Sequence, residues 1–179
     1  SVDRDDLPDL GANFWATTVS RVKERNPEVT LETLIPDFNG IEELIYKVID
    51  AGPEIISHNM ETVRRLTPKV RSRAKYDISL KTIETIAKSG KTKPKSGIMV
   101  GLGETEEEVL ETMDDLIHVG CQVLTIGQYL QPTRKHLTVK EFVTPEQFRK
   151  YRAIGLEKGF KFVESGPLVR SSYHAERHV

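Results

Sequence analysis

Residues 95–108, Lys-Ser-Gly-Ile-Met-Val-Gly-Leu-Gly-Glu-Thr-Glu-Glu-Glu, carry the signals of a strand, a tight turn and a helix in succession. The first six form a β-rich run, and the two glycines after them permit a tight turn. Thr105 and Glu108 have the spacing of a capping box, and Gly120 lies where the helix should end. Another β-rich run, 122–126, comes next. This order predicts a parallel strand–helix–strand unit.

Strand and helix patterns alternate along the rest of the chain as well, with no flexible linker between them. Several of the strand-like runs are apolar without clean alternation, as strands covered on both faces tend to be. The patterns predict one α/β domain with a parallel sheet, either barrel-like or doubly wound. The predicted strands cover residues 29–35, 54–57, 95–100, 122–126 and 160–163, and the predicted helices cover residues 11–25, 41–49, 79–88, 105–117 and 144–154.

The first six residues are polar and resemble a loop that leaves the C-terminal end of a strand, although no strand pattern precedes them. Either the domain opens on a loop or its first strands lie upstream of residue 1. The second alternative predicts a sheet with an exposed edge.

The composition excludes several classes of protein. Among 179 residues, 26 are Lys or Arg and 27 are Asp or Glu, so the net charge of −1 gives no strong field toward nucleic acid or an anionic membrane. No apolar run is long enough to span a bilayer, and the N-terminus lacks the order of a secretory signal. The single cysteine, Cys121, excludes an iron–sulfur or zinc site built from this chain's own thiolates. We therefore expect a cytoplasmic protein with no nucleic-acid and no membrane partner.

Polar residues follow each predicted strand. Because α/β proteins bind their ligands where the carboxyl ends of parallel strands meet, these residues are candidates for a site that takes a polar small molecule. The alternative is that each side chain only caps a helix or holds a loop. The candidates are Asp37, His58, Asn59, Glu61, Gly101, Gly103, Glu104, Gln128 and the segment 166–174.

Several motifs have a plain structural interpretation. The turn at 101–104 is neither a P-loop nor a full dinucleotide fingerprint, and an ordinary tight turn is an equally good interpretation. His58 fits a packed loop histidine better than a metal ligand, and Cys121 fits a buried, inert thiol. The basic run 64–75 fits a solvated face, with docking of an acidic partner as the alternative. No Gly-x-Ser-x-Gly elbow is present, which disfavours a serine hydrolase.

Six sequence motifs are more specific: Ser-Val-Asp-Arg-Asp-Asp-Leu (1–7), Pro-Asp-Phe (36–38), Ser-His-Asn-Met-Glu-Thr-Val (57–63), Lys-Ser-Gly-Ile-Met-Val-Gly-Leu-Gly-Glu-Thr (95–105), Leu-Thr-Ile-Gly-Gln-Tyr-Leu-Gln-Pro-Thr-Arg (124–134) and Gly-Pro-Leu-Val-Arg-Ser-Ser-Tyr-His-Ala (166–175). In this order, over essentially the whole chain, they resemble the lipoyl synthases. The Gln-Tyr-Leu-Gln-Pro and Arg-Ser-Ser-Tyr blocks are particularly specific to that family. Departures are small, such as Leu10 in place of Gly and Met60 in place of Leu.

The resemblance implies an incomplete parallel (β/α)6 barrel of the radical S-adenosylmethionine (SAM) type, without its first strands. It implies a sulfurtransferase of lipoate biosynthesis, which inserts two sulfur atoms at C6 and C8 of a protein-bound octanoyl group. The family uses two 4Fe-4S clusters, one to generate a 5′-deoxyadenosyl radical from SAM and one as the sulfur donor. All their cysteine ligands lie upstream of the matched part, so we expect these 179 residues alone to be inactive.

The resemblance also implies partners and a division of the chain. The octanoyl group is carried by a lipoyl carrier domain or by the glycine cleavage H protein, and an iron–sulfur carrier protein rebuilds the consumed cluster. Residues 1–165 correspond to the barrel portion, and residues 166–179 to a segment that closes the site of the second cluster.

Site residues are implied by the same resemblance. Ser172, with Ser171 as the alternate, matches the serine that ligates the second cluster, with Arg170 and Tyr173 in support. Tyr129 and Leu130 would border the octanoyl channel, and Asp3 and Arg4 are weaker candidates for SAM contacts. The cofactor-binding candidates are Asn59, Glu61, Gly101, Gly103, Glu104 and Gln128.

Two alternatives of other classes stay open. One is a cluster-free α/β module that binds a nucleoside or an acyl-carrier domain without chemistry. The other is a metal-independent barrel enzyme with Glu61 or Glu104 as general base. A Cys-x3-Cys-x2-Cys motif upstream of residue 1 would decide against both.

Overall fold

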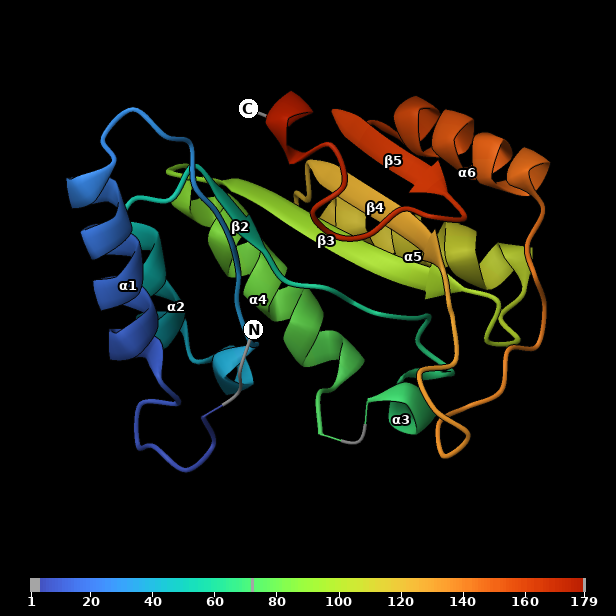
Figure 1. Ribbon diagram of the computed structural model, residues 1–179, viewed down its shortest axis with the longest axis horizontal. Coiled ribbons are helices and arrows are strands. Elements are labelled where there is room, and N and C mark those ends of the chain that lie inside the picture. The colour runs from blue at the N-terminus through green and yellow to red at the C-terminus, as the bar shows by residue number, and fades with distance from the viewer. Residues whose placement is uncertain (1–3, 72, 179) are drawn as a thin grey trace.

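Five parallel strands form one sheet in the order β1-β2-β3-β4-β5, so each strand pairs with the next one in the sequence (Figure 1). The computed structural model describes residues 4–71 and 73–178. Within them the sheet stays open between β1 and β5, which confirms the expectation of a parallel α/β fold with an incomplete barrel. The strands are β1 (Glu32–Leu34), β2 (Ile55–Ser57), β3 (Lys93–Val100), β4 (Val123–Gln128) and β5 (Phe162–Gly166).

Helices cover the outer face of this sheet and leave the inner face open to the C-terminal segment (Figure 1). Neighbouring helices pack in the order α1, α2, α4, α5 and α6 along the sheet. No helix among the described residues is both long enough and apolar enough to cross a bilayer. The helices are α1 (Ala12–Arg25), α2 (Glu42–Asp50), α3 (Thr67–Val70), α4 (Tyr76–Ser89), α5 (Glu106–His118) and α6 (Pro145–Lys158), with short 3-10 turns η1 (Phe38–Gly40) and η2 (Ala175–Arg177).

The core lies between the sheet and these helices in two clusters. One gathers β1, β2, α1, α2 and α4 around Ile45, Ile56 and Ile86. The other, larger cluster joins β3, β4, α5 and α6, with Met113 and Phe148 fully buried. Burial of this kind contributes roughly 1.5–3 kcal/mol for each large apolar side chain, so the helices hold the strand ends in fixed positions.

The observed elements differ from the predicted ones mainly at their ends. β3 begins at Lys93, two residues earlier than predicted, and contains Pro94. Proline usually argues against a central strand, so the sequence pattern placed the start of the strand after it. β4 extends through Gln128, so this residue ends the strand instead of following it, and β5 covers Phe162–Gly166 instead of 160–163. The four-residue helix α3 inside the basic run was not predicted.

The C-terminal segment, residues 167–178, returns over the inner face of the sheet (Figure 1). Gly127 on β4 makes this possible, because a Cβ there would collide with the carbonyl oxygen of Val169. Near its end, His178 is fully buried with its ring 5.6 Å from that of Phe162, and its carbonyl accepts a hydrogen bond of 3.1 Å from Lys93 Nζ. The predicted boundary between the barrel portion and the C-terminal segment, at residue 165, falls inside β5, which ends at Gly166.

A side chain at residue 127 is expected to displace this segment. Gly127→Ala in the full protein should cost about 1–3 kcal/mol of unfolding free energy, as for other overpacked sites. Limited proteolysis should then cleave residues 167–178 faster than in the unaltered protein. Gly166→Ala is the matched control, because its Cβ would only reach Val169 Cγ2 at 3.4 Å. Equal protease resistance of the two variants would contradict the expectation.

Candidate functional site

Two adjoining cavities lie at the carboxyl edge of the sheet. The first, of about 250 Å³, is formed by β3, β4 and the C-terminal segment and is called the inner cavity here. The second, of about 500 Å³, lies at the ends of β1 and β2 and is called the rim cavity. Leu34, Asn59 and Glu61 line both, so the two cavities adjoin and make up one hollow region of the surface. The predicted meeting of strand ends at one edge is therefore present.

Gly97, in the wall of the inner cavity, lets two side chains lie against β3. A Cβ at this position would lie 2.5 Å from Thr125 Oγ1 and 3.1 Å from Asn59 Oδ1. Asn59 Oδ1 is buried and has no hydrogen-bond partner among the residues that the structure describes. Buried polar atoms are nearly always paired, so this oxygen is an acceptor that a ligand donor can use. The wall of the inner cavity therefore holds an unpaired acceptor that suits a polar ligand.

Glu61 is held in a strained conformation beside the same wall. Its φ of +65° is unusual for a residue with a side chain and costs on the order of 1 kcal/mol. Its N–H donates to Gly97 O at 3.0 Å, and its carbonyl accepts from Met99 N–H at 2.8 Å. These two bonds to β3 stabilise the strained backbone and fix the carboxylate at the junction of the two cavities.

Gln128 also lines the inner cavity, but its amide is used within the chain. Its Nε2 donates to the carbonyls of Tyr129 and Glu141, each at 3.0 Å, and its Oε1 accepts from Val143 N–H at 2.9 Å. Gly101, with a φ of +98°, supports the same contact, since a Cβ there would collide with Gln128 Nε2. Both residues therefore hold the loop that follows β4.

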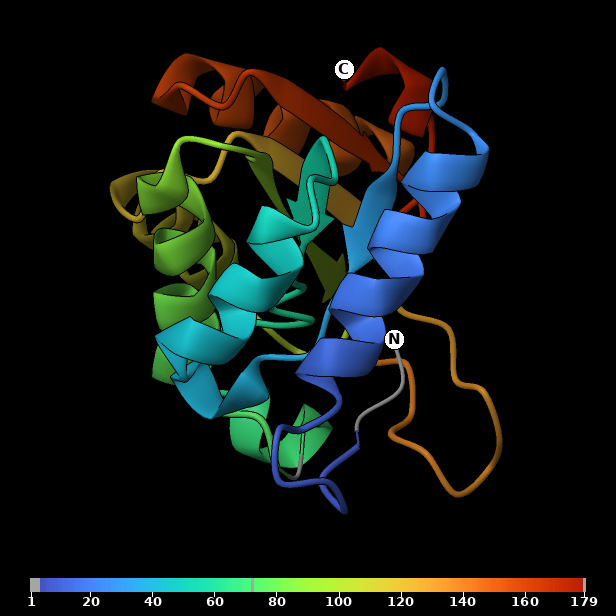
Figure 2. The same cartoon turned by 90° about the vertical axis from the view of Figure 1, so that its left-hand side faces the viewer.

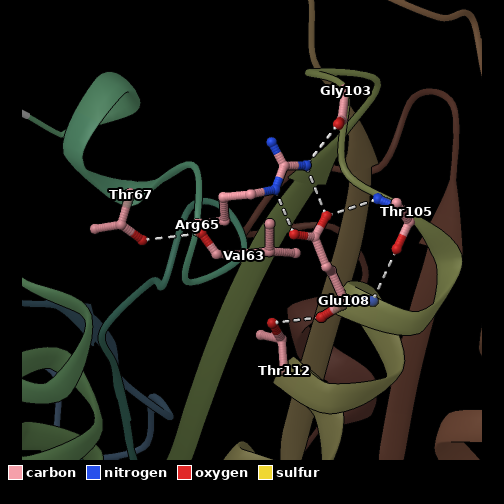
Figure 3. A network of polar contacts seen from close by, with 7 residues as sticks. All are labelled: Val63, Arg65, Thr67, Gly103, Thr105, Glu108 and Thr112. Atoms are coloured by element: carbon pink, nitrogen blue, oxygen red, sulfur yellow. Dashed lines mark hydrogen bonds and ion pairs between the residues drawn. The ribbon is translucent and has the colours of Figure 1, made fainter.

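Gly103 and Glu104, the other two candidates in the turn after β3, line neither cavity. Glu104 accepts hydrogen bonds from the backbone N–H groups of Gly101 and Leu102, which closes the turn. The carbonyl of Gly103 accepts from Arg65 at 2.9 Å, and Arg65 pairs with Glu108 in the capping box that begins α5 (Figure 3). These contacts fit the ordinary tight turn, and a cofactor role for Gly103 and Glu104 stays a prediction.

The C-terminal segment brings two of its predicted residues to the inner cavity. Arg170 and Ser171 line it beside Gly127 and Gln128. Ser172 is exposed and does not line it, and Tyr173 lies instead beside His174, with the ring centroids 4.3 Å apart. Of the two candidate serines, the alternate Ser171 therefore lies nearer the strand ends in this structure.

His58 forms the floor of the rim cavity as a buried histidine. Burial lowers its pKa to about 4, so the ring is neutral at pH 7 and its Nδ1–H donates to Ile35 O at 3.0 Å. Its Nε2 accepts from Ser79 Oγ at 2.9 Å, and Ser79 Oγ accepts from Arg71 Nη1 at 2.8 Å. The interpretation as a packed loop histidine is confirmed. This chain of bonds ties the ends of β1 and β2 to α4.

Charged residues complete the rim cavity. Arg4 lines it and pairs with Asp6 at 2.7 Å, which keeps the pKa of that carboxyl below its usual value. Asp37 lines it as well and caps η1 by accepting from Asn39 N–H at 2.9 Å. Asp3, the other weaker candidate, lies outside the described residues.

The basic run 64–75 is mostly engaged within the chain. Arg64 pairs with Asp77 at 2.6 Å and lies over the ring of Tyr76 at 4.2 Å, and Arg73 pairs with Asp5. The run stays mostly exposed, which agrees with the interpretation as a solvated face. It connects the loops of the carboxyl edge, and only the long-range contacts reveal that function.

No group of three or more His, Cys, Asp or Glu side chains among the described residues is placed to hold a metal ion. Cys121 is buried, and burial raises the pKa of its thiol to about 12. The interpretation of Cys121 as an inert thiol is thereby confirmed. A hydroxyl of the C-terminal segment is the one predicted cluster ligand in this part of the protein.

Comparison with known proteins agrees with this architecture. Two proteins named lipoyl synthase, from Bacteroides thetaiotaomicron and Phocaeicola vulgatus, are 67% and 66% identical over all 179 residues. The chain spans 63% of the length of each. A domain of the pyruvate-formate lyase-activating enzyme from Bacteroides vulgatus has the same fold, with a TM-score of 0.68 at 13% identity over 89% of this chain and 94% of that one.

The sequence profile of the Radical SAM superfamily matches residues 2–116, which include β1, β2, β3 and the backbone at Asn59, Glu61 and Gly97. The open parallel sheet, the polar hollow at its carboxyl edge and this match lead to the same assignment. The chain belongs to the Radical SAM superfamily.

Proposed function

We propose that this chain is part of a lipoyl synthase, which inserts two sulfur atoms at C6 and C8 of a protein-bound octanoyl group. The orphaned oxygen of Asn59, a residue that lines the inner cavity, is the structural observation that carries the proposal. High identity to proteins named lipoyl synthase supports it over the full chain. The octanoylated carrier substrate, a lipoyl carrier domain or glycine cleavage H protein, and a cytoplasmic location belong to this proposal.

The residues of the inner cavity fit SAM. Asn59 Oδ1 can accept a hydrogen bond from a ligand N–H or hydroxyl. Glu61 can bind a hydroxyl or an ammonium group at the junction with the rim cavity. When bound with a reduced 4Fe-4S cluster, SAM supplies the means to remove hydrogen from an unactivated carbon. The half-buried Leu34 adds an apolar side chain to the wall at that point.

For the two 4Fe-4S clusters, the proposed contribution of this chain is a hydroxyl oxygen of the C-terminal segment. Ser172 is the proposed ligand and Ser171 the alternate. A hydroxyl oxygen is a harder ligand than thiolate and holds iron less firmly, which suits a cluster that releases sulfur. Arg170 lines the inner cavity and can offset negative charge there. The thiolates are proposed to come from upstream of residue 1, and an iron–sulfur carrier protein to restore the cluster.

The proposed function predicts a defined product. The complete protein, with reconstituted clusters, SAM and a reductant, should add two sulfur atoms to an octanoylated carrier domain. Mass spectrometry of the carrier and chromatography of methionine and 5′-deoxyadenosine measure both halves of the reaction. Omission of SAM is the control. Formation of 5′-deoxyadenosine without sulfur in the carrier would assign the protein to another radical SAM reaction.

Asn59→Ala separates ligand binding from folding. We expect the Kd for SAM to rise about tenfold, which is the loss of one good hydrogen bond. The stability of the ligand-free protein should fall by less than about 1 kcal/mol, because no protein hydrogen bond is broken. Calorimetric titration and thermal unfolding measure the two effects. Asn13→Ala on α1 is the control, and equal SAM affinity in both variants would contradict a contact with Asn59.

Replacement of the two serines tests the cluster ligand. Ser172→Ala in the complete protein should lose the iron of one cluster and its electron paramagnetic resonance signal. Sulfur insertion should fall at least about 100-fold, while 5′-deoxyadenosine formation persists, because the other cluster is unaffected. Ser171→Ala is the matched control. If Ser171→Ala alone has these effects, the alternate serine is the ligand, and if neither variant has them, the assignment is wrong.

A further inference from the structure

The loop between β4 and α6 is an exposed, partly apolar surface next to the inner cavity. It covers residues 129–144 and is called the β4–α6 loop. Figure 2 shows it projecting from the body of the molecule. Leu130, Leu137 and Phe142 are 53%, 43% and 74% exposed. Large apolar side chains gathered on one exposed loop are typical of a surface that contacts another molecule.

The same loop carries cations that have no partner. Arg134, Lys135 and Lys140 are exposed, and none forms an ion pair with another residue that the structure describes. With Glu141 as its one acid, the loop has a net charge of +2 in a chain whose net charge is −1. The basic run 64–75 differs, since Arg64, Arg65 and Arg73 pair with carboxylates of the chain. The free cations of the β4–α6 loop therefore remain available for an external partner.

The loop is ordered without a partner, although it is exposed. Gln128 fixes its base through Glu141 and Val143, and Tyr129 Oη donates to Leu137 O at 2.8 Å. At its tip, Gln131 Nε2 donates to His136 O at 2.9 Å. A surface that is already ordered loses less conformational entropy on binding, so its apolar and charged groups contribute more of their interaction energy to affinity.

We propose that the β4–α6 loop docks the carrier protein, through an acidic face of that protein with an apolar patch at its centre. This inference rests on the proposed function, which supplies a partner whose acylated lysine must reach the strand ends. Gln128 connects the loop directly to the inner cavity, so a domain seated on the loop presents its lysine arm at that opening. Arg134 and Lys135 attract the acidic face, and Phe142 fills the apolar patch.

Charge reversal in the complete enzyme tests the docking surface. Arg134→Glu with Lys135→Glu should raise the Kd and the KM for the octanoylated carrier domain about tenfold or more at low salt. The effect should shrink as ionic strength rises. The KM for a short octanoyl-lysine peptide, which lacks the domain surface, should change less than twofold. Phe142→Ser should weaken domain binding at every salt concentration.

The matched control is Arg25→Glu with Lys161→Glu. It makes the same change of charge at exposed positions that precede β1 and β5, at the opposite edge of the sheet. Equal Kd values for the domain in the two double variants would overturn the docking inference, as would an equal loss for domain and peptide. If the unaltered enzyme converts neither substrate, the proposed function fails, and calorimetric Kd values still decide whether the loop binds the acidic domain.

Discussion

The contact between the C-terminal segment and the inner face of the sheet is the constraint on which the candidate site depends. An inward side chain at residue 127 would take the place of the carbonyl of Val169, and Arg170 and Ser171 could not reach the cavity. Gly97, on the neighbouring strand, leaves room for the side chains of Thr125 and Asn59. Both glycines therefore accommodate a piece of the protein, the C-terminal segment at Gly127 and two side chains at Gly97.

Two energetically unfavourable features of the fold, an unpaired buried oxygen and a strained backbone, lie together at the inner cavity. Asn59 keeps a buried oxygen without a partner, and Glu61 keeps an unfavourable backbone conformation. Neither residue belongs to the two core clusters. Strain and unpaired polar atoms persist only where the surroundings hold them, and they occur most often at sites that bind or react. Their coincidence supports a ligand at the inner cavity more strongly than either feature does alone.

The sequence predicted what depends on near neighbours. The capping box of Thr105 and Glu108 is a local device, and α5 begins where it places the start. The roles of Gln128 and Gly101 could not be predicted in this way, because they depend on a close approach to Glu141, a residue more than ten positions away. Composition also gives no sign that the carbonyl of Val169 lies against β4. The likeness of whole sequence blocks to a family supplied the function, which local physical patterns alone left open.

The basic residues also show that a sequence pattern does not reveal which side chains form ion pairs in the folded protein. Two basic stretches look alike in the sequence, but Arg64, Arg65 and Arg73 of 64–75 form ion pairs with carboxylates of the chain. The cations of the β4–α6 loop form no ion pair among the described residues, although Gln128 and Gly101 hold that loop firmly in place. Exposed charge contributes little to stability, so an ordered loop with unpaired cations is not explained by folding. Recognition of a partner explains both its order and its charge, and the position of the loop beside the inner cavity connects that partner to the chemistry.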